Sequence, residues 1–194
     1  MLDGQWGTIR WMSDLRVRSD AGLGLIHVMV LMVRLLVAGH GYSGQGTPPM
    51  FGDYEAQRHW MELSIHLPAR EWYTYDVQYW GLDYPPLSAY HAWLVGSVLH
   101  KIFPEMVELD RSRGFESADS KLYMRWSVIL SDVFVYLPIV YVASGAIFWA
   151  RRTNDVNVAS STMTSAAGCY LFVSIVPALI LIDHGHFQYN GVSL

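Results

Sequence analysis

The chain has 194 residues, 52% of them hydrophobic and only 15% charged, with a mean hydropathy of +0.20. This composition is too apolar for an ordinary soluble domain and indicates a membrane protein. Its net charge of −4, its 13 scattered Lys and Arg residues and its single cysteine exclude a basic nucleic-acid-binding surface and an internal disulfide framework.

The first predicted element after a polar N-terminal tail, 1–21, is a membrane span at 22–39. The apolar run GLGLIHVMVLMVRLLVAG has about the 20 residues that a helix needs to cross the hydrocarbon core. A membrane anchor is favoured over a cleavable signal peptide because the polar lead is long. His27 and Arg34 interrupt the run, so Arg34 is expected either to snorkel to the membrane surface or to face the interior of a helix bundle.

The next predicted element is a polar loop, 40–86, that contains one helix. The helix is expected to begin near Tyr54 and to end at Pro68. A 3.6-residue period predicts an amphipathic helix lying on the membrane, with Trp60 at the level of the lipid headgroups. Its polar face would be Glu55, His59, Glu62 and His66, and its apolar face Ala56, Trp60, Leu63 and Leu67.

The stretch EWYTYDVQYWGLDY, which follows that helix, mixes six aromatic residues with three acidic ones. Such a mixture suits stacking on sugar rings and hydrogen bonding to sugar hydroxyls. An interfacial aromatic belt is the alternative explanation, and on composition alone it is favoured.

The remainder, 87–194, is predicted to hold further spans at about 87–103, 122–150 and 166–182, followed by the motif DHGHFQYN. The third of these spans contains Pro177, which is tolerable where neighbouring helices satisfy the freed backbone groups. The Lys and Arg distribution favours a cytosolic N-terminus. If 87–103 crosses the membrane, the final motif lies on the side opposite Asp53; if it only dips in, the two share one side.

Four stretches also carry a resemblance to a known family: GDYEAQRHWMELSIHLP, EWY, YWGLDYPPLSAYHAWL and LIDHGHFQYNGVSL. Over roughly residues 50–194 the chain resembles the dolichyl-phosphate-glucose-dependent alpha-1,3-glucosyltransferases of the endoplasmic reticulum. The form GDYEAQRHWME favours the members that add the first glucose over the sister enzymes that add the second. The resemblance implies an all-α, polytopic membrane protein, the N-terminal part of a GT-C-type glycosyltransferase fold, in which 40–86 is a lumenal catalytic loop.

What the resemblance implies about function is transfer of glucose from dolichyl phosphate glucose to the terminal mannose of the dolichyl-pyrophosphate-linked oligosaccharide of protein N-glycosylation. The link formed would be alpha-1,3, with inversion, at the lumenal side of the endoplasmic reticulum membrane, and without a metal or other cofactor. Because family members are longer and this chain stops after QYNGVSL, it is expected to be a truncated N-terminal portion. A catalytically incomplete membrane protein is the competing hypothesis.

Asp53 occupies the position that the resemblance assigns to the catalytic base, which takes the proton from the attacking sugar hydroxyl. Its alternative role is helix capping, because Asp before a helix is a good N-cap. The other candidate site residues, expected to bind substrate, are Glu55, Arg58, His59, Asp83, Tyr84, Asp183, His184, His186 and Gln188.

Alternatives apply to several of these residues. Arg58 and His59 suit a phosphate, but they can equally pair with a glutamate one helical turn away. Asp83 is explained as well by turn chemistry. Asp183, His184 and His186 match no standard zinc spacing, so a metal site is not favoured.

Overall fold

In the computed structural model, residues 20–154 and 166–193 are described, and every regular element within them is helical. The prediction of an all-α fold is therefore confirmed for these residues, while the predicted tail lies almost wholly outside them. In chain order the elements are α2 (Asp20–Ala38), α3 (Gly52–His66), α4 (Pro86–Ile102), the 3₁₀-helix η1 (Pro104–Val107), α5 (Ala118–Ser131), the π-helix η2 (Asp132–Tyr136), α6 (Leu137–Asn154), α7 (Ala166–Ser174), α8 (Pro177–His186) and α9 (Asn190–Ser193).

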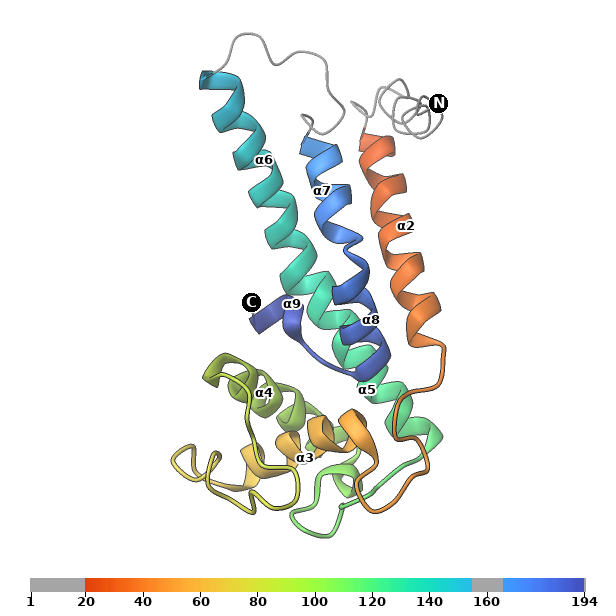
Figure 1. Cartoon of the computed structure of the whole chain (residues 1–194), viewed down its shortest axis with the longest axis vertical. Coiled ribbons are helices and arrows are strands. Elements are labelled where there is room, and N and C mark those ends of the chain that lie inside the picture. Colours follow the sequence, from red (N-terminus) through yellow and green to blue (C-terminus); the bar gives the residue numbers. More distant parts are fainter. Residues whose placement is uncertain (1–19, 155–165, 194) are drawn as a thin grey trace, which may run out of the picture.

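These helices form two parts (Figure 1). The continuous run α5–η2–α6 stands side by side with α2 and with the pair α7–α8, and together they make an upright bundle. Helices α3 and α4 pack on each other across one end of that bundle. Residues 40–117, which contain both, are named the cap.

The bundle carries the membrane-type helices. Among the described residues, 118–147 is the one unbroken helix long and apolar enough to cross a membrane, and α7 with α8 passes the same test as a pair bent by 44°. Helix α2 is apolar but shorter. Large apolar side chains are exposed on the outside of all three, with Leu25 68%, Phe134 74% and Phe172 64% exposed. Such a surface suits a lipid surrounding.

The bend between α7 and α8 lies at Pro177, whose missing N–H leaves backbone carbonyls free. Neighbouring helices supply the donors. The Tyr136 hydroxyl donates to the Val173 carbonyl at 2.9 Å, and the Arg34 guanidinium donates to the Ser174 carbonyl at 2.8 Å. The prediction that neighbours satisfy this break is confirmed, and Arg34, 1% exposed, faces the bundle interior rather than snorkelling.

Helix α3 is the core of the cap. It ends where predicted, because Leu67, before Pro68, is extended. The amphipathic interpretation is wrong: polar residues such as Glu62 and apolar ones such as Leu63 are both fully buried, and Trp60 is only 5% exposed. The Trp60 indole donates to the Trp80 carbonyl at 3.1 Å, so it packs in protein rather than among lipid headgroups. Loops 67–85 and 103–117 cover the faces that the periodicity assigned to water and lipid.

Close approach of α3 and α4 depends on Gly96. A Cβ added there would lie 2.9 Å from the Met61 carbonyl oxygen and 3.0 Å from Ile65. Gly96→Ala is therefore expected to destabilise the protein by about 1–3 kcal/mol, because the backbones must separate. The matched control is Gly145→Ala on α6, where nothing lies within 4 Å and helix propensity improves. Thermal unfolding of the two variants in detergent measures the difference; equal melting temperatures would contradict it.

Candidate active site at the junction of cap and bundle

Asp53 and His186 meet at the junction between the two parts of the fold. Asp53 lies in the first turn of α3 and His186 is the last residue of α8, 133 residues further along the chain. Asp53 Oδ2 and His186 Nδ1 are 2.8 Å apart, and their side chains are 39% and 42% exposed. The pair is therefore formed yet accessible, as a group that exchanges protons with a substrate needs to be.

A tight turn sets the position of Asp53. Phe51 and Gly52 both have positive φ, at 52° and 62°, and a Cβ on Gly52 would lie 2.5 Å from the Ser43 carbonyl oxygen. Only glycine fits there without displacing the backbone. Phe51 is the N-cap of α3 and no side chain caps the helix, so the capping role considered for Asp53 is not the one that this structure shows.

Side chains from the loop before α4 and from the end of the chain form a hydrogen-bond network near this pair. The Tyr84 hydroxyl donates to Gln188 Oε1 at 2.7 Å, which joins the loop before α4 to the end of the final motif. The Asn190 amide donates to the same oxygen at 3.1 Å and to Asp183 Oδ1 at 2.8 Å. Tyr84 and Gln188 were both predicted as site residues, but a contact between them was not predicted. The structure shows that they are hydrogen-bonded.

Negative charge gathers around Tyr84. Burial raises the pKa of the Tyr84 hydroxyl, and the charges of Asp83, Asp53 and Asp183 raise that pKa further. Asp83 itself is exposed. Two of the predicted carboxylates, Asp53 and Asp83, are therefore accessible near Tyr84. Asp183, in contrast, is only 3% exposed. Its carboxylate accepts hydrogen bonds from the backbone N–H groups of Asn190 and Gly191, at 3.0 and 2.9 Å.

His184 points into the bundle rather than toward His186. It is 1% exposed, and its Nε2 lies 3.0 Å from Asp132 Oδ2. Asp132 lies in the π-helix, and its carboxylate also accepts a hydrogen bond from Arg34 Nε at 2.5 Å. The sequence analysis missed Asp132, although a signal was present: it is ionisable within an apolar segment, as are Arg34 and His184, and such residues pair with one another. π-Helical turns are frequent at functional sites.

The predicted site residues of α3 form an ionic network inside the cap. Arg58 donates to both carboxylate oxygens of Glu55, at 2.5 and 2.7 Å, and lies 2.7 Å from Glu62. It also donates to Ser112 Oγ at 2.5 Å, which ties α3 to the loop before α5. Glu55, Arg58, His59 and Glu62 are all 0% exposed. The alternative of pairing across one helical turn is what the structure shows; contact of these residues with substrate stays a prediction.

This network predicts a pH dependence. Burial alone would raise the pKa of Glu62, but the hydrogen bond to His59 and the charge of Arg58 lower it from 4.5 to about 2. A carboxylate whose pKa is lower in the folded state stabilises the fold above its unfolded pKa, and this stabilisation disappears as the pH falls through the folded pKa. The free energy of unfolding lost in Glu62→Gln should therefore be largest at neutral pH and should shrink between pH 4.5 and about 2. Denaturant unfolding over a pH series measures it, with Glu71→Gln, at a side chain 43% exposed, as the control; a pH-independent difference would contradict the prediction.

The described part of the chain was also searched for side chains that could bind a metal ion together. No group of three His, Cys, Asp or Glu side chains there is arranged to hold a metal ion. Asp183 and His184, which the sequence placed near His186, are instead engaged with Asn190 and Asp132. The described geometry supports proton transfer by Asp53 and His186 and hydrogen bonding by Tyr84 and Gln188.

The described residues thus form a helical bundle capped by an aromatic-rich layer, with an accessible carboxylate and imidazole between them. The chain belongs to the ALG6, ALG8 glycosyltransferase family, whose sequence profile matches residues 30–194.

Curated relatives agree with this assignment. The chain is 48% identical over 174 residues to the probable dolichyl pyrophosphate Man9GlcNAc2 alpha-1,3-glucosyltransferase of Dictyostelium discoideum, covering 88% of this chain and 32% of that relative. It is 44% identical over 173 residues to the Saccharomyces cerevisiae enzyme of the same activity, covering 88% and 30%, and 44% identical over 182 residues to that of Rattus norvegicus, covering 92% and 34%. The chain thus spans about a third of the length of these relatives.

Proposed function

We propose that this chain supplies the base-bearing part of a glucosyltransferase that moves glucose from dolichyl phosphate glucose to the terminal mannose of the dolichyl-pyrophosphate-linked oligosaccharide, in protein N-glycosylation. The observation that carries the proposal is the accessible Asp53–His186 pair, at 2.8 Å, in a member of this glycosyltransferase family. The relatives' names, which specify Man9GlcNAc2, support addition of the first glucose rather than the second.

In the proposed reaction Asp53 accepts the proton of the mannose hydroxyl as that oxygen attacks the anomeric carbon of glucose. The bond from this carbon to the phosphate oxygen breaks, and dolichyl phosphate leaves with the electron pair. One such displacement inverts the configuration. In the tautomer that carries its hydrogen on Nδ1, His186 donates to Asp53 Oδ2, which orients the carboxylate and leaves Oδ1 for the substrate hydroxyl.

The fold supports a particular membrane topology for this reaction. We propose that α2, α5–α6 and α7–α8 cross the membrane and that α4, lying across the end of the bundle with α3, does not. Three crossings from a cytosolic N-terminus put Asp53 and His186 together in the lumen. They also leave Arg151 and Arg152 on the cytosolic side, as the positive-inside rule favours.

This topology makes a direct prediction. A glycosylation acceptor, Asn-x-Ser/Thr, introduced at position 110 of the cap should be glycosylated in microsomes, whereas one introduced at position 157, between the second and third crossings, should not. Gel mobility before and after glycosidase treatment distinguishes the two. Glycosylation at 157 but not at 110 would place Asp53 in the cytosol and overturn the proposed function.

The activity test is transfer of labelled glucose to the lipid-linked oligosaccharide in microsomes that lack the endogenous enzyme. Two forms are compared: this chain, and a chimaera in which it replaces the matching 173 residues of the yeast relative. Glucose transfer by the chimaera is expected. Transfer by the chimaera alone would favour the hypothesis that the chain by itself is a catalytically incomplete membrane protein, and no transfer by either would contradict the proposal.

A further inference from the structure

The position of His186 depends on contacts made outside its own helix. Helix α8, Pro177–His186, is short, and the bend of 44° at Pro177 separates it from α7. The last carbonyls of any helix have no further turn to supply their donors. The C-cap residue, Phe187, has a positive φ of 61°, so the chain changes direction directly after His186. The partners of the residues beside His186 therefore decide where its imidazole lies.

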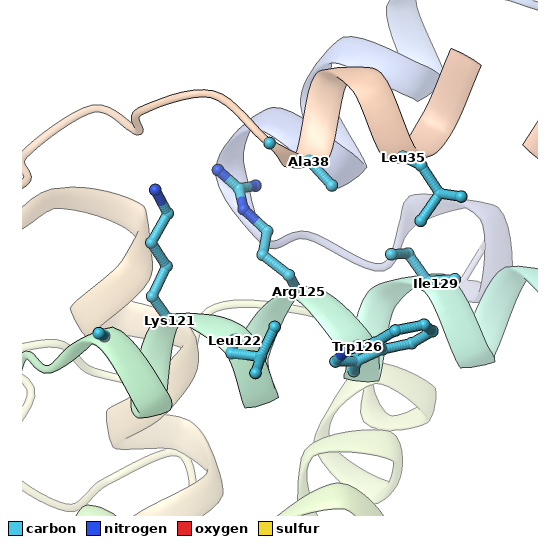
Figure 2. A pocket seen from close by; sticks show the side chains of 9 residues that line it. Leu35, Ala38, Lys121, Leu122, Arg125, Trp126 and Ile129 are labelled. Atoms are coloured by element: carbon cyan, nitrogen blue, oxygen red, sulfur yellow. The ribbon is translucent and has the colours of Figure 1, made fainter. Parts of the chain in front are cut away.

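Arg125 of α5 binds the chain on both sides of His186. Its Nη1 donates to the carbonyl of His184, two residues earlier, and its guanidinium carbon lies 3.9 Å from the ring centre of Phe187, the next residue. Its Nη2 donates to the His40 carbonyl at 3.3 Å, just beyond α2. Figure 2 shows the Arg125 side chain extending from α5 toward the end of α2. A cation also suits the C-terminal end of a helix such as α8.

The same helix, α5, binds the residue next to Asp53. Tyr54 follows Asp53 in α3, and its hydroxyl donates to Ser120 Oγ at 2.6 Å. The rings of Tyr54 and Phe187 meet edge to face with their centres 5.2 Å apart, and both residues are 0% exposed. The neighbours of Asp53 and of His186 thus pack on each other, and side chains of α5 hold both of them.

Arg125 is 5% exposed, yet its burial is not explained by an ion pair. Within the described residues it forms none with a carboxylate. Glu116 accepts hydrogen bonds elsewhere, from the Tyr42 hydroxyl at 2.8 Å and the Gly46 amide at 2.9 Å. Burying a guanidinium without a counter-ion is costly. What Arg125 binds instead is backbone carbonyl groups and an aromatic ring, which indicates that it holds segments of the chain in place.

We propose that Arg125 is a positioning residue for the transfer reaction, which keeps the His186 imidazole against the Asp53 carboxylate without contacting the reacting atoms. This inference rests on the proposed function and adds a residue of α5 to its machinery. Without Arg125 the end of α8 shifts and Asp53 is less well oriented. The rate of the bound complex should therefore fall while substrate binding is kept.

The experiment uses the purified chimaera with the yeast relative and measures kcat and the KM values for dolichyl phosphate glucose and the lipid-linked oligosaccharide. Arg125→Lys keeps the charge but loses the planar fork that reaches two carbonyls. It should lower kcat about tenfold and change both KM values by less than about twofold, because a small displacement of a catalytic group is costly. The matched control is Lys121→Gln, one helical turn earlier and beside Arg125 in Figure 2. Lys121 contacts the Tyr42 ring at 5.6 Å, and its substitution should change neither kcat nor KM.

A double-mutant cycle shows whether Arg125 acts through His186. In a chimaera that already carries His186→Ala, Arg125→Lys should lower kcat by less than about twofold, because no imidazole remains to be positioned. An equal loss with and without His186, as general destabilisation would give, would overturn the inference; thermal unfolding of each variant measures that destabilisation. If Arg125→Lys does not fold, Phe187→Leu, which removes the ring beside the guanidinium, takes its place in the cycle.

The kinetic results also separate this inference from its alternatives. A raised KM for the donor in both Arg125→Lys and Lys121→Gln would indicate a ligand site on this face of α5 and would overturn the positioning role. Absence of transfer by the unmodified chimaera would overturn the proposed function, and this inference with it. Normal transfer by the unmodified chimaera together with an additive cycle would overturn this inference alone.

Discussion

Asp53→Asn is expected to lower glucose transfer by at least about 100-fold, because a positioned general base contributes about 10²–10⁴ to the rate. The amide has almost the shape of the carboxylate and can still bond His186, but it cannot accept the proton. Asp53 is 39% exposed and caps no helix, so its loss should leave the fold intact. The rate is measured in microsomes with the chimaera, alongside its thermal unfolding.

The control is Asp53→Glu, which keeps a carboxylate but displaces it by one methylene. It should retain more transfer than Asp53→Asn, although less than the unmodified protein, since small displacements of catalytic groups are costly. Substantial turnover by Asp53→Asn with normal unfolding would remove Asp53 as the base. An equal loss of activity and of stability would instead indicate a structural role.

Sequence patterns predicted the helices of this fold but not how they are arranged. Apolar runs located α2, α6 and α7, and Pro68 marked the end of α3. Pro177 was expected inside one span, but it begins a separate helix, α8, bent by 44° from α7. Hydropathy did not distinguish α4 from the bundle helices, because it measures composition and not the direction in which a helix runs. What turns α4 across the bundle is its packing on α3, where Gly96 admits the backbone of Met61.

The four residues of the candidate site were all among the residues that the motifs and the family resemblance selected: Asp53, His186, Tyr84 and Gln188. The structure joins them in two pairs. The pairing itself was not predictable, since Asp53 and His186 are 133 residues apart and no local pattern encodes such a contact. The sequence left open whether the final motif shares a side with Asp53, and the fold places the motif beside it.

Helix α3 shows why periodicity misled. Glu55, His59 and Glu62 recur at helical spacing, which indicates a polar face but not what covers that face. Here a loop covers it, with Ser112 and the Asp110 backbone N–H bonded to Glu62 at 2.9 and 2.7 Å. An internal ionic network and a solvated face therefore give the same sequence pattern.

Arg58→Met is expected to destabilise the cap by about 3–5 kcal/mol, because it leaves the carboxylates of Glu55 and Glu62 buried without their cation. Hydrogen exchange of the α3 amides, which reports local opening of the cap, measures this loss. The matched control is Arg70→Met. Arg70 is 83% exposed and its contact with Glu71 spans 3.3 Å, so less than about 1 kcal/mol should be lost.

A second substitution separates the structural role of Arg58 from a substrate-binding role. If Arg58 serves the network, the double variant Glu55→Gln/Arg58→Met should be less unstable than the sum of the two single variants, because each removes the partner that the other leaves unpaired. If Arg58 instead binds the donor phosphate, Arg58→Met should raise the KM for the donor while the exchange of α3 stays normal. With Arg58 0% exposed and bonded on both sides to glutamates, the first result is expected, and normal exchange with a raised KM would contradict it.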